Sequence, residues 1–226
     1  DTHAGRGLYD LWSDDAARSP EWQNGIGRLW SWQQAPPLIR QLLSAVSASN
    51  EGNQLRLYPG SPALIVQALR DTDVLSACEL HPEEHAILRR VLPRQANFQI
   101  HARDGWEALS ALLPPTQRRG LVLIDPPYEQ PDELSRAPHA IATALKRFAH
   151  GMYLWWRPLK RTADLDAADA ELLARGASSM LRADLWVDTP MPDGRLAGSS
   201  VLVINPPFGL KDALLQALPA LSERLS

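Results

Sequence analysis

The chain has 226 residues, a formal net charge of −3, 45% hydrophobic and 22% charged residues, and a single cysteine. No apolar run approaches the length of a membrane span, and the net charge argues against a protein that coats nucleic acid nonspecifically, because such binding rests on many Lys and Arg contacts to phosphates. One cysteine excludes an internal disulfide and no signal-peptide pattern opens the chain, so we expect one soluble globular domain in a reducing cytoplasm.

The chain opens with Asp1-Thr2-His3-Ala4-Gly5-Arg6-Gly7. A Gly-x-Gly turn normally follows a strand, and its glycines let the backbone approach a ligand closely, which makes Gly5 a candidate cofactor contact. Because no strand precedes this turn, we expect the first strand of the sheet to be missing from the chain. Alone, the turn is a weak signal, and a frayed terminus would look the same.

Residues 9–57 are rich in Trp, Gln, Ser and Ala, and their apolar residues recur at helical spacing. We therefore expect a small helical subdomain inserted into the main domain. Four tryptophans concentrate there: Trp12, Trp22, Trp30 and Trp32. A miniature hydrophobic core is the favoured interpretation of these rings, ahead of a platform on which bases stack.

The segment from Tyr58 to Pro62 returns the chain to the main domain. Ser61 is expected to cap a helix that has Pro62 at its first position. Plain capping is the common role of such a serine, although a helix N-terminus also suits a ligand carboxylate.

A short apolar strand over 74–79 ends on Glu79. In dinucleotide-type folds an acid at the end of the second strand accepts hydrogen bonds from ribose hydroxyls, so Glu79 is a candidate cofactor ligand. Cys78, His81 and His85 straddle this strand and the helix that begins at Pro82. They lack a fourth partner, so we expect no metal site.

Residues 97–102 alternate like a third strand, and Asp104-Gly105 follows it. An Asp-Gly pair usually marks a turn, but a carboxylate at this strand end would equally accept the adenine amine of a cofactor. Both readings remain open at this point.

Leu121–Ile124 is an unbroken apolar run typical of a strand buried on both faces, and Asp125-Pro126-Pro127-Tyr128 follows it. The prolines make the chain leave the sheet in a stiff, extended form. Acceptors and an aromatic ring at this edge favour a flat ring that carries an amine. The Asp125 carboxylate and Pro126 carbonyl would hold the amine hydrogens, and Tyr128 would stack on the base. The tetrad resembles the Asp/Asn-Pro-Pro-aromatic motif of amino-group methyltransferases; a structural proline-rich turn is the alternative.

Beyond this tetrad we expect helices over 138–149 and from Leu165 to Gly176, a strand over 152–156, and a helix from Leu210. Strands over 180–187 and 199–204 are expected to be joined through Pro192-Asp193-Gly194 in a hairpin-like connection. Asn205-Pro206-Pro207-Phe208 imitates the first tetrad. Because the cofactor candidates lie on the first three strands, the amine acceptor belongs beside them, and we expect Asn205 to be a structural turn.

A local basic patch would have to bind any nucleic acid. The candidates form three groups: Arg89, Arg90, Arg94 and Arg103; Arg118 and Arg119; and Lys146, Arg147, Arg157, Lys160 and Arg161. Solvated surface charge is the more common role of any single one of them.

Several segments together resemble the ribosomal RNA large subunit methyltransferase J family, namely those over 1–5, 58–62, 79–82, 104–105, 118–129 and 203–207. The resemblance implies an α/β, class I S-adenosylmethionine-dependent methyltransferase fold, with a Rossmann-like seven-stranded sheet and a helical insertion. It implies methylation of the N6 amine of an adenine in 23S ribosomal RNA by a monomer. It also implies that S-adenosylmethionine is contacted by His3, Ser61, Glu79, Asp104 and Gly105, and that Asp125 is catalytic.

The sequence departs from this family in two places. The family's N-terminal segment, with its own His and Lys contacts, is absent, and Phe208 stands where Trp is more usual. Other classes share the tetrad or the fold: a DNA adenine or protein glutamine methyltransferase, and a non-catalytic RNA-binding scaffold.

Overall fold

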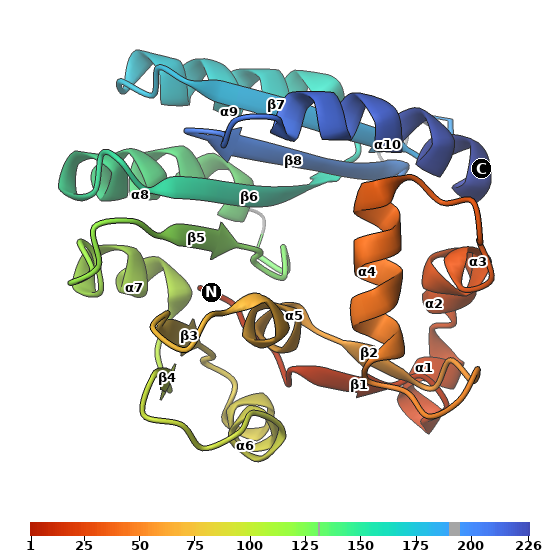
Figure 1. Ribbon diagram of the computed structural model, residues 1–226. Helices are drawn as coiled ribbons and strands as arrows, with labels where there is room; N and C mark the ends of the chain where they lie inside the picture. Colours follow the sequence, from red (N-terminus) through yellow and green to blue (C-terminus); the bar gives the residue numbers. More distant parts are fainter. Residues whose placement is uncertain (131, 190–194) are drawn as a thin grey trace.

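The computed structural model describes residues 1–130, 132–189 and 195–226 (Figure 1). Its strands are β1 (Leu8–Asp10), β2 (Leu57–Pro59), β3 (Leu75–Cys78), β4 (Phe98–His101), β5 (Leu121–Ile124), β6 (Met152–Leu159), β7 (Met180–Trp186) and β8 (Gly198–Ile204). Its helices are α1 (Asp14–Arg18), α2 (Glu21–Asn24), α3 (Ile26–Leu29), α4 (Pro37–Ser47), α5 (Ser61–Ala68), α6 (Pro82–Val91), α7 (Gly105–Ala111), α8 (Glu133–Arg147), α9 (Thr162–Ala174) and α10 (Leu210–Leu225).

The main sheet is built from two strand groups that the first residues of the chain join. β3 and β4 pair in parallel, and β5, β6, β8 and β7 form a second ladder in that order. Between them, the Thr2 amide donates to the Leu123 carbonyl at 3.0 Å and the Ala4 amide donates to the Cys78 carbonyl at 2.9 Å. Asp1–Ala4 thus occupies the position of the first strand between β3 and β5, which the sequence had led us to expect to be missing, while the fold is α/β as predicted.

Strand direction within the second ladder decides which edge each strand end reaches. β5 and β6 are parallel, whereas β8 runs antiparallel to both β6 and β7. The end of β5 at Ile124 lies opposite Trp155, while the end of β8 at Ile204 lies opposite Tyr153, near the start of β6. The carboxyl ends of β5 and β8 therefore lie at opposite edges of the sheet.

Helices cover both faces of this sheet. α7, α8 and α9 follow one another on one side, and α5 and α10 lie on the other (Figure 1). The largest core cluster is centred on fully buried residues of the second ladder, including Ile124, Tyr153 and Trp155. Apolar alternation explains this, since every second residue of β6 is buried.

The inserted segment differs in part from the expected helical subdomain. α1 to α4 are present, but the segment begins and ends on β1 and β2, which pair antiparallel with Tyr9 opposite Tyr58. A three-residue ladder leaves too short a pattern to be detected from periodicity. The division into a main domain and an insertion over 9–57 stays a prediction.

A separate hydrophobic cluster lies inside this segment. Trp22, Trp30 and Trp32 pack around a buried group that includes Leu29 and Val46, which is the miniature core favoured from the sequence. Trp12 is different because it is 57% exposed. Leu221 and Leu225 of α10 join the cluster, so the segment packs on the C-terminal helix, and α4 stands between α10 and the β1–β2 pair (Figure 1).

Some predicted boundaries were wrong. α8 begins at Glu133, so Pro138 lies inside the helix instead of starting it; an internal proline forfeits one backbone hydrogen bond. Gly60, not Ser61, occupies the N-cap of α5, and Ser61 is its first residue. Pro192-Asp193-Gly194 lies outside the described residues. Within the described ranges, none of the helices combines the length and apolar character needed to cross a membrane.

Candidate active site

The candidate residues converge where β3, β4 and β5 end. These strands run in one direction, so their carboxyl ends share an edge, and the first residues of the chain run between β3 and β5 to reach it. The sequence predicted cofactor contacts at these strand ends, and hydrogen bonds join several of the predicted residues to the N-terminal segment.

The turn after Ala4 is tied to Glu79. The Gly5 amide donates to Glu79 Oε2 at 2.8 Å, and the Gly5 φ of 61° lies in the left-handed region that favours glycine. A Cβ at Gly5 would come 2.5 Å from the Tyr9 hydroxyl. Glycine is therefore required here by both conformation and space.

The Glu79 carboxylate is held by two backbone amides. Besides Gly5, the His81 amide donates to Glu79 Oε1 at 2.7 Å. A carboxylate oxygen can accept more than one hydrogen bond, so both oxygens keep capacity for ligand hydroxyls. Glu79 thus combines a fixed orientation with free acceptor sites.

Asp104 begins α7 instead of forming a free-standing turn. Its Oδ1 accepts from the Trp106 amide at 2.7 Å and the Glu107 amide at 3.0 Å, which is N-cap geometry. Among the described residues, no hydrogen bond to Oδ2 is found. A Cβ at Gly105 would collide with the Thr2 carbonyl and come 2.8 Å from the His3 ring, so Gly105 lets α7 approach the N-terminal segment.

His3 is kept neutral by its surroundings. Burial lowers the pKa of His3 to about 4, against the opposing influence of the Asp104 carboxylate. Its Nδ1 lies 2.8 Å from the Thr2 hydroxyl, and its ring meets Trp106 edge-on at 5.4 Å between centroids. The Arg136 guanidinium lies over the Trp106 ring, 5.3 Å from the ring centre. A neutral imidazole at pH 7 is a hydrogen-bonding group, not a cation.

Ser61 reaches the same edge through Asp1. Its hydroxyl donates to Asp1 Oδ2 at 2.7 Å. The sequence did not single out Asp1, because an acid at the first position of the chain gives no pattern. Ser61, Glu79, Asp104 and the turn at His3 and Gly5 are thereby brought together around the N-terminal segment, and their roles toward a cofactor stay predictions.

Asp125 differs from the other carboxylates at this edge. No hydrogen bond to its carboxylate is found among the described residues, and the residue is exposed. The surrounding protein still removes much of its hydration, and this desolvation raises the pKa of Asp125 to about 6. Asp125 therefore offers an unused acceptor that is ionised at pH 7 but is more basic than an ordinary aspartate.

Tyr128 is fixed by a pair of tryptophans on β6. Its hydroxyl donates to the Trp156 carbonyl at 2.7 Å and accepts from Trp155 Nε1 at 2.8 Å, and burial raises its pKa. Its φ of 56° is uncommon for a residue with a bulky side chain, and such strain is often found at functional sites. The sequence missed these tryptophans as supports; it predicted a strand ending at Trp156, whereas β6 continues to Leu159 and places Trp155 opposite Ile124 at the end of β5.

Arg157 continues this support and is not part of a nucleic-acid patch. The side chain is fully buried, forms an ion pair with Asp169 and donates to the Ser200 hydroxyl at 2.9 Å. Its guanidinium lies 5.0 Å from the Trp155 ring centre. The sequence interpretation was wrong because Arg157 alternates inward on β6 with Tyr153 and Trp155.

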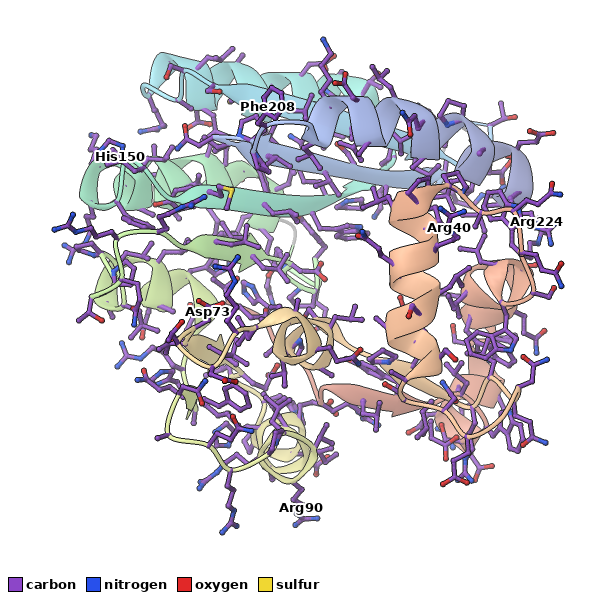
Figure 2. All side chains as sticks on the ribbon, in the orientation of Figure 1. Arg40, Asp73, Arg90, His150, Phe208 and Arg224 are labelled. Atoms are coloured by element: carbon purple, nitrogen blue, oxygen red, sulfur yellow. The ribbon has the colours of Figure 1, made fainter. Side chains whose placement is uncertain are left out.

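The Asn205 turn is structural. Its side-chain amide donates to the Ala149 and Gly151 carbonyls at 2.9 and 2.8 Å, so both amide hydrogens are used. Phe208, which is labelled in Figure 2, is fully exposed. Over the residues that the structure describes, no group of three or more His, Cys, Asp or Glu side chains is arranged to hold a metal.

Comparison with known proteins places this geometry in context. A family described as "Ribosomal RNA large subunit methyltransferase D, RlmJ" matches residues 1–226. The chain is similar to ribosomal RNA large subunit methyltransferase J of Escherichia coli (strain K12), with 38% identity over all of this chain and 80% of that protein. The protein of the same name from Haemophilus influenzae is 36% identical over the same shares. The crystal structure of protein LPL1258 from Legionella pneumophila covers 99% of this chain and 82% of its own, with a TM-score of 0.91 and 31% identity.

Proposed function

Because this chain belongs to the ribosomal RNA large subunit methyltransferase family matched over residues 1–226, we propose that it transfers a methyl group from S-adenosylmethionine to the N6 amine of an adenine in 23S ribosomal RNA. Family membership makes it an rRNA methyltransferase. The choice of amine is supported by one observation above all: at the end of β5, the Asp125 carboxylate has no hydrogen-bond partner among the residues that the structure describes.

The residues at the sheet edge fit S-adenosylmethionine. Glu79 keeps free acceptor capacity for two ribose hydroxyls, and Asp104 keeps one oxygen for the adenine amine. Gly5 and Gly105 let the backbone at this edge pack closely, since a Cβ would meet the Tyr9 hydroxyl at Gly5 and the Thr2 carbonyl at Gly105. When bound there, S-adenosylmethionine supplies an electrophilic methyl group on a sulfonium.

Asp125 and Pro126 would act on the target amine. The lone pair of an aromatic amine is delocalised into its ring, so it becomes nucleophilic only when acceptors hold its hydrogens and turn the lone pair toward the electrophile. The Asp125 carboxylate would accept one N–H and the Pro126 carbonyl the other. The methylated amine must then lose a proton, and a carboxylate with a pKa of about 6 is a better acceptor for it than an ordinary aspartate.

Tyr128 would present its ring to the target base. Its hydroxyl is already fixed by Trp155 and Trp156, so the ring cannot rotate away when the base arrives. A stacked base gains roughly 1–3 kcal/mol from such a contact. The strained backbone at Tyr128 is maintained by these same hydrogen bonds.

The inserted segment over 9–57 is proposed to contribute to RNA selection. It carries its own hydrophobic cluster and is joined to the main sheet region through β1 and β2. Deleting 11–55 and joining the strands should leave cofactor affinity intact while relaxing the choice of adenine. If a folded deletion variant methylates the same adenine with undiminished selectivity, the segment is scaffolding.

The function is tested by offering labelled S-adenosylmethionine with naked rRNA, ribosomal subunits, DNA and protein in parallel. We expect methyl transfer to rRNA, with N6-methyladenosine as the product after digestion to nucleosides. Transfer to DNA or to a glutamine side chain in preference to rRNA would overturn the proposal.

A further inference from the structure

An rRNA methyltransferase with a net charge of −3 needs a local basic surface, since its overall field does not attract RNA. Many of its arginines are neutralised. Those in ion pairs with carboxylates are Arg6, Arg18, Arg56, Arg157, Arg161, Arg175 and Arg182. Among the arginines, those without such a partner are therefore the first candidates for binding RNA outside the edge that carries Asp125.

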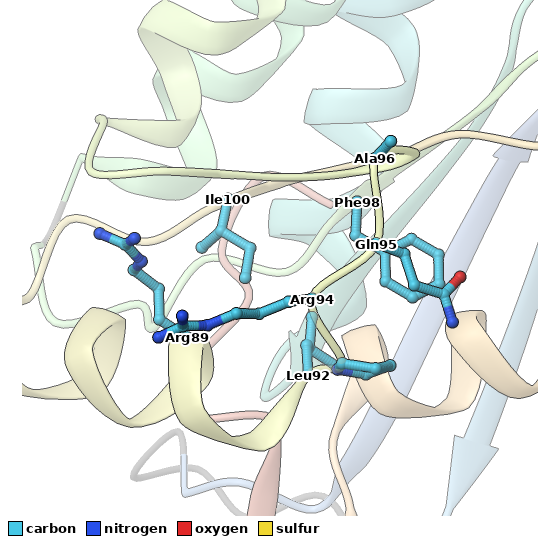
Figure 3. Close-up of a pocket in the computed structure, with 8 residues that line it drawn as sticks. Arg89, Leu92, Arg94, Gln95, Ala96, Phe98 and Ile100 are labelled. Carbon is cyan, nitrogen blue, oxygen red and sulfur yellow. The ribbon is translucent and has the colours of Figure 1, made fainter.

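Two such arginines line the same cavity. The cavity has a volume of about 610 Å³ and lies between the C-terminal end of α6 and β4 (Figure 3). β4 is an edge strand, because its partner β3 bonds to Asp1–Ala4 on its other side. Its lining residues are Arg89, Leu92, Pro93, Arg94, Gln95, Ala96, Phe98 and Ile100. Arg89 and Arg94 are exposed and, within the described part of the chain, neither forms an ion pair.

The acidic side chains of α6 lie away from this cavity. Glu83 and Glu84 are in its first turn, whereas Arg89 and Arg90 are in its last, and Glu84 is already paired with Arg6. Five to six residues, or about 8–9 Å along the helix axis, separate these carboxylates from Arg89, and Arg94 lies beyond the end of the helix, so salt screens the carboxylates partly at Arg89 and more at Arg94. None of the described lining residues carries a carboxylate.

The cavity also has an apolar side. Phe98 and Ile100 are only partly buried, and their inner parts pack on the cluster around Leu75 and Leu88. Two cations beside a partly exposed aromatic ring are complementary to a phosphate with an adjoining base or ribose. A purely apolar partner would leave both guanidinium groups without a counter-charge.

We propose that this basic cavity, formed by Arg89, Arg94 and Phe98, is a second contact site for the rRNA substrate, which binds its backbone away from the target adenine. The proposal rests on the proposed function. Because α6 starts directly after Glu79 and His81 at the catalytic edge, the helix would set the spacing between the two contacts. Two-point attachment would orient the RNA before the adenine enters the site.

The sequence grouped Arg90 and Arg103 with Arg89 and Arg94, but neither of them lines the cavity. Arg90 points outward below α6 (Figure 2), and Arg103 follows the carboxyl end of β4.

Two simpler roles compete with RNA binding. Basic residues in the last turn of a helix interact favourably with its dipole, and charges beside an edge strand discourage aggregation. Both roles predict a change in stability or solubility on substitution, without a change in RNA affinity.

The test compares R89Q/R94Q with R175Q/K211Q, which lowers the net charge by the same two units on the β7–β8 side of the sheet. Arg175 is paired with Glu171, so this control measures the effect of net charge apart from the loss of unpaired cations in the cavity. For R89Q/R94Q we expect KM for 23S rRNA to rise roughly tenfold and the slope of log K against log salt to fall by about 1.5, from roughly 0.7–0.9 per phosphate contact. Its kcat and cofactor affinity should stay unchanged. R175Q/K211Q should retain the wild-type KM and slope.

An RNA series of decreasing length around the methylated adenine sharpens the test. The penalty of R89Q/R94Q should disappear for fragments too short to reach the cavity. Unchanged KM and salt slope in a folded R89Q/R94Q variant, or equal losses in R175Q/K211Q, would overturn the proposal. Absence of rRNA methylation by the wild-type protein would instead remove the proposed function, so the two failures are distinguishable.

Discussion

The turn after β5 and the turn after β8 share a Pro-Pro pair but use the preceding polar residue in different ways. Asn205 donates both amide hydrogens to backbone carbonyls, whereas no hydrogen bond to the Asp125 carboxylate is found among the described residues. A satisfied amide holds a loop together, while a partly desolvated and unpartnered carboxylate is available for a ligand. Nearly the same four letters thus make a structural turn at one strand end and a candidate site at the other.

Strand direction explains why the two turns differ. β8 runs antiparallel to β6, so Asn205 emerges at the sheet edge opposite to the one that carries Asp125, Glu79 and Asp104. The strained residue differs as well: φ is positive at Asn205 in one turn and at Tyr128 in the other. Asn tolerates this conformation readily, but Tyr does so only when its surroundings hold it there, as Trp155 and Trp156 do.

The largest expected difference between the turns is in catalysis. Asp125→Ala should lower single-turnover methyl transfer several hundredfold or more, because one preorganised hydrogen bond in a transition state is typically associated with about 2.7–4 kcal/mol. Asn205→Ala should keep the wild-type rate per folded molecule while lowering the free energy of unfolding by about 1–3 kcal/mol. A slow Asn205→Ala enzyme with normal stability would mean that the two turns have been assigned the wrong way round.

The next largest effect is on cofactor binding, because the turn after β5 lies at the same sheet edge as Glu79 and the turn after β8 does not. Glu79→Ala removes acceptors for ribose hydroxyls and also frees the Gly5 and His81 amides. We expect S-adenosylmethionine affinity to fall by about 1.5–3 kcal/mol in calorimetry. Glu171→Ala, which removes a surface carboxylate paired with Arg175, is the matched control and should bind normally. Equal affinity in both variants would exclude Glu79 from the cofactor site.

A smaller effect separates the two aromatic residues. Tyr128→Phe leaves Trp155 Nε1 without its hydrogen-bond partner, which should cost about 1–3 kcal/mol of stability and lower kcat through a looser ring. Phe208 is fully exposed, so Phe208→Ala should change the free energy of unfolding by less than about 0.5 kcal/mol. Chemical denaturation of both variants measures the difference. Equal destabilisation would show that the tryptophan pair does not hold Tyr128.

The smallest expected effect is on the pH dependence of stability. Desolvation by the surrounding protein raises the pKa of Asp125 to about 6, above its value in an unfolded chain, so ionisation between about pH 4 and pH 6 weakens the folded state. Asp125→Asn should therefore be more stable than wild type at pH 8 and equal to it near pH 4. Asn205→Asp provides the contrast, because it places a carboxylate where the Asn205 amide donates to two backbone carbonyls. If Asp125→Asn is the less stable protein at pH 8, the carboxylate has a stabilising partner that contradicts this account.

Local chemistry made much of the site predictable. Asp125-Pro126-Pro127-Tyr128 and Glu79 each follow a short apolar run, so their place at strand ends could be read from the sequence. Asp104 was less determined, because an Asp-Gly pair is compatible with a turn and with a helix N-cap, and the tertiary position of α7 decided for the cap. The roles of these residues in binding cofactor and RNA stay predictions.

Long-range contacts could not be predicted in this way. The hydrogen bond between Ser61 and Asp1, the support of Tyr128 by Trp155 and Trp156, and the pairing of β1 with β2 join residues distant in sequence. Arg157 was misplaced for the same reason, since only the packing of α9 on the sheet provides Asp169 as its buried partner. Sequence spacing defines local elements, whereas such contacts depend on how these elements assemble.

The central claim, that Asp125 activates the N6 amine of an adenine in 23S rRNA, is tested most directly by nucleoside mass spectrometry. The wild-type protein and Asp125→Asn, each shown by calorimetry to bind S-adenosylmethionine, would be incubated with unmodified 23S rRNA. The account predicts one N6-methyladenosine per rRNA molecule with the wild type and essentially none with Asp125→Asn. Robust N6-methyladenosine formation by Asp125→Asn would contradict it.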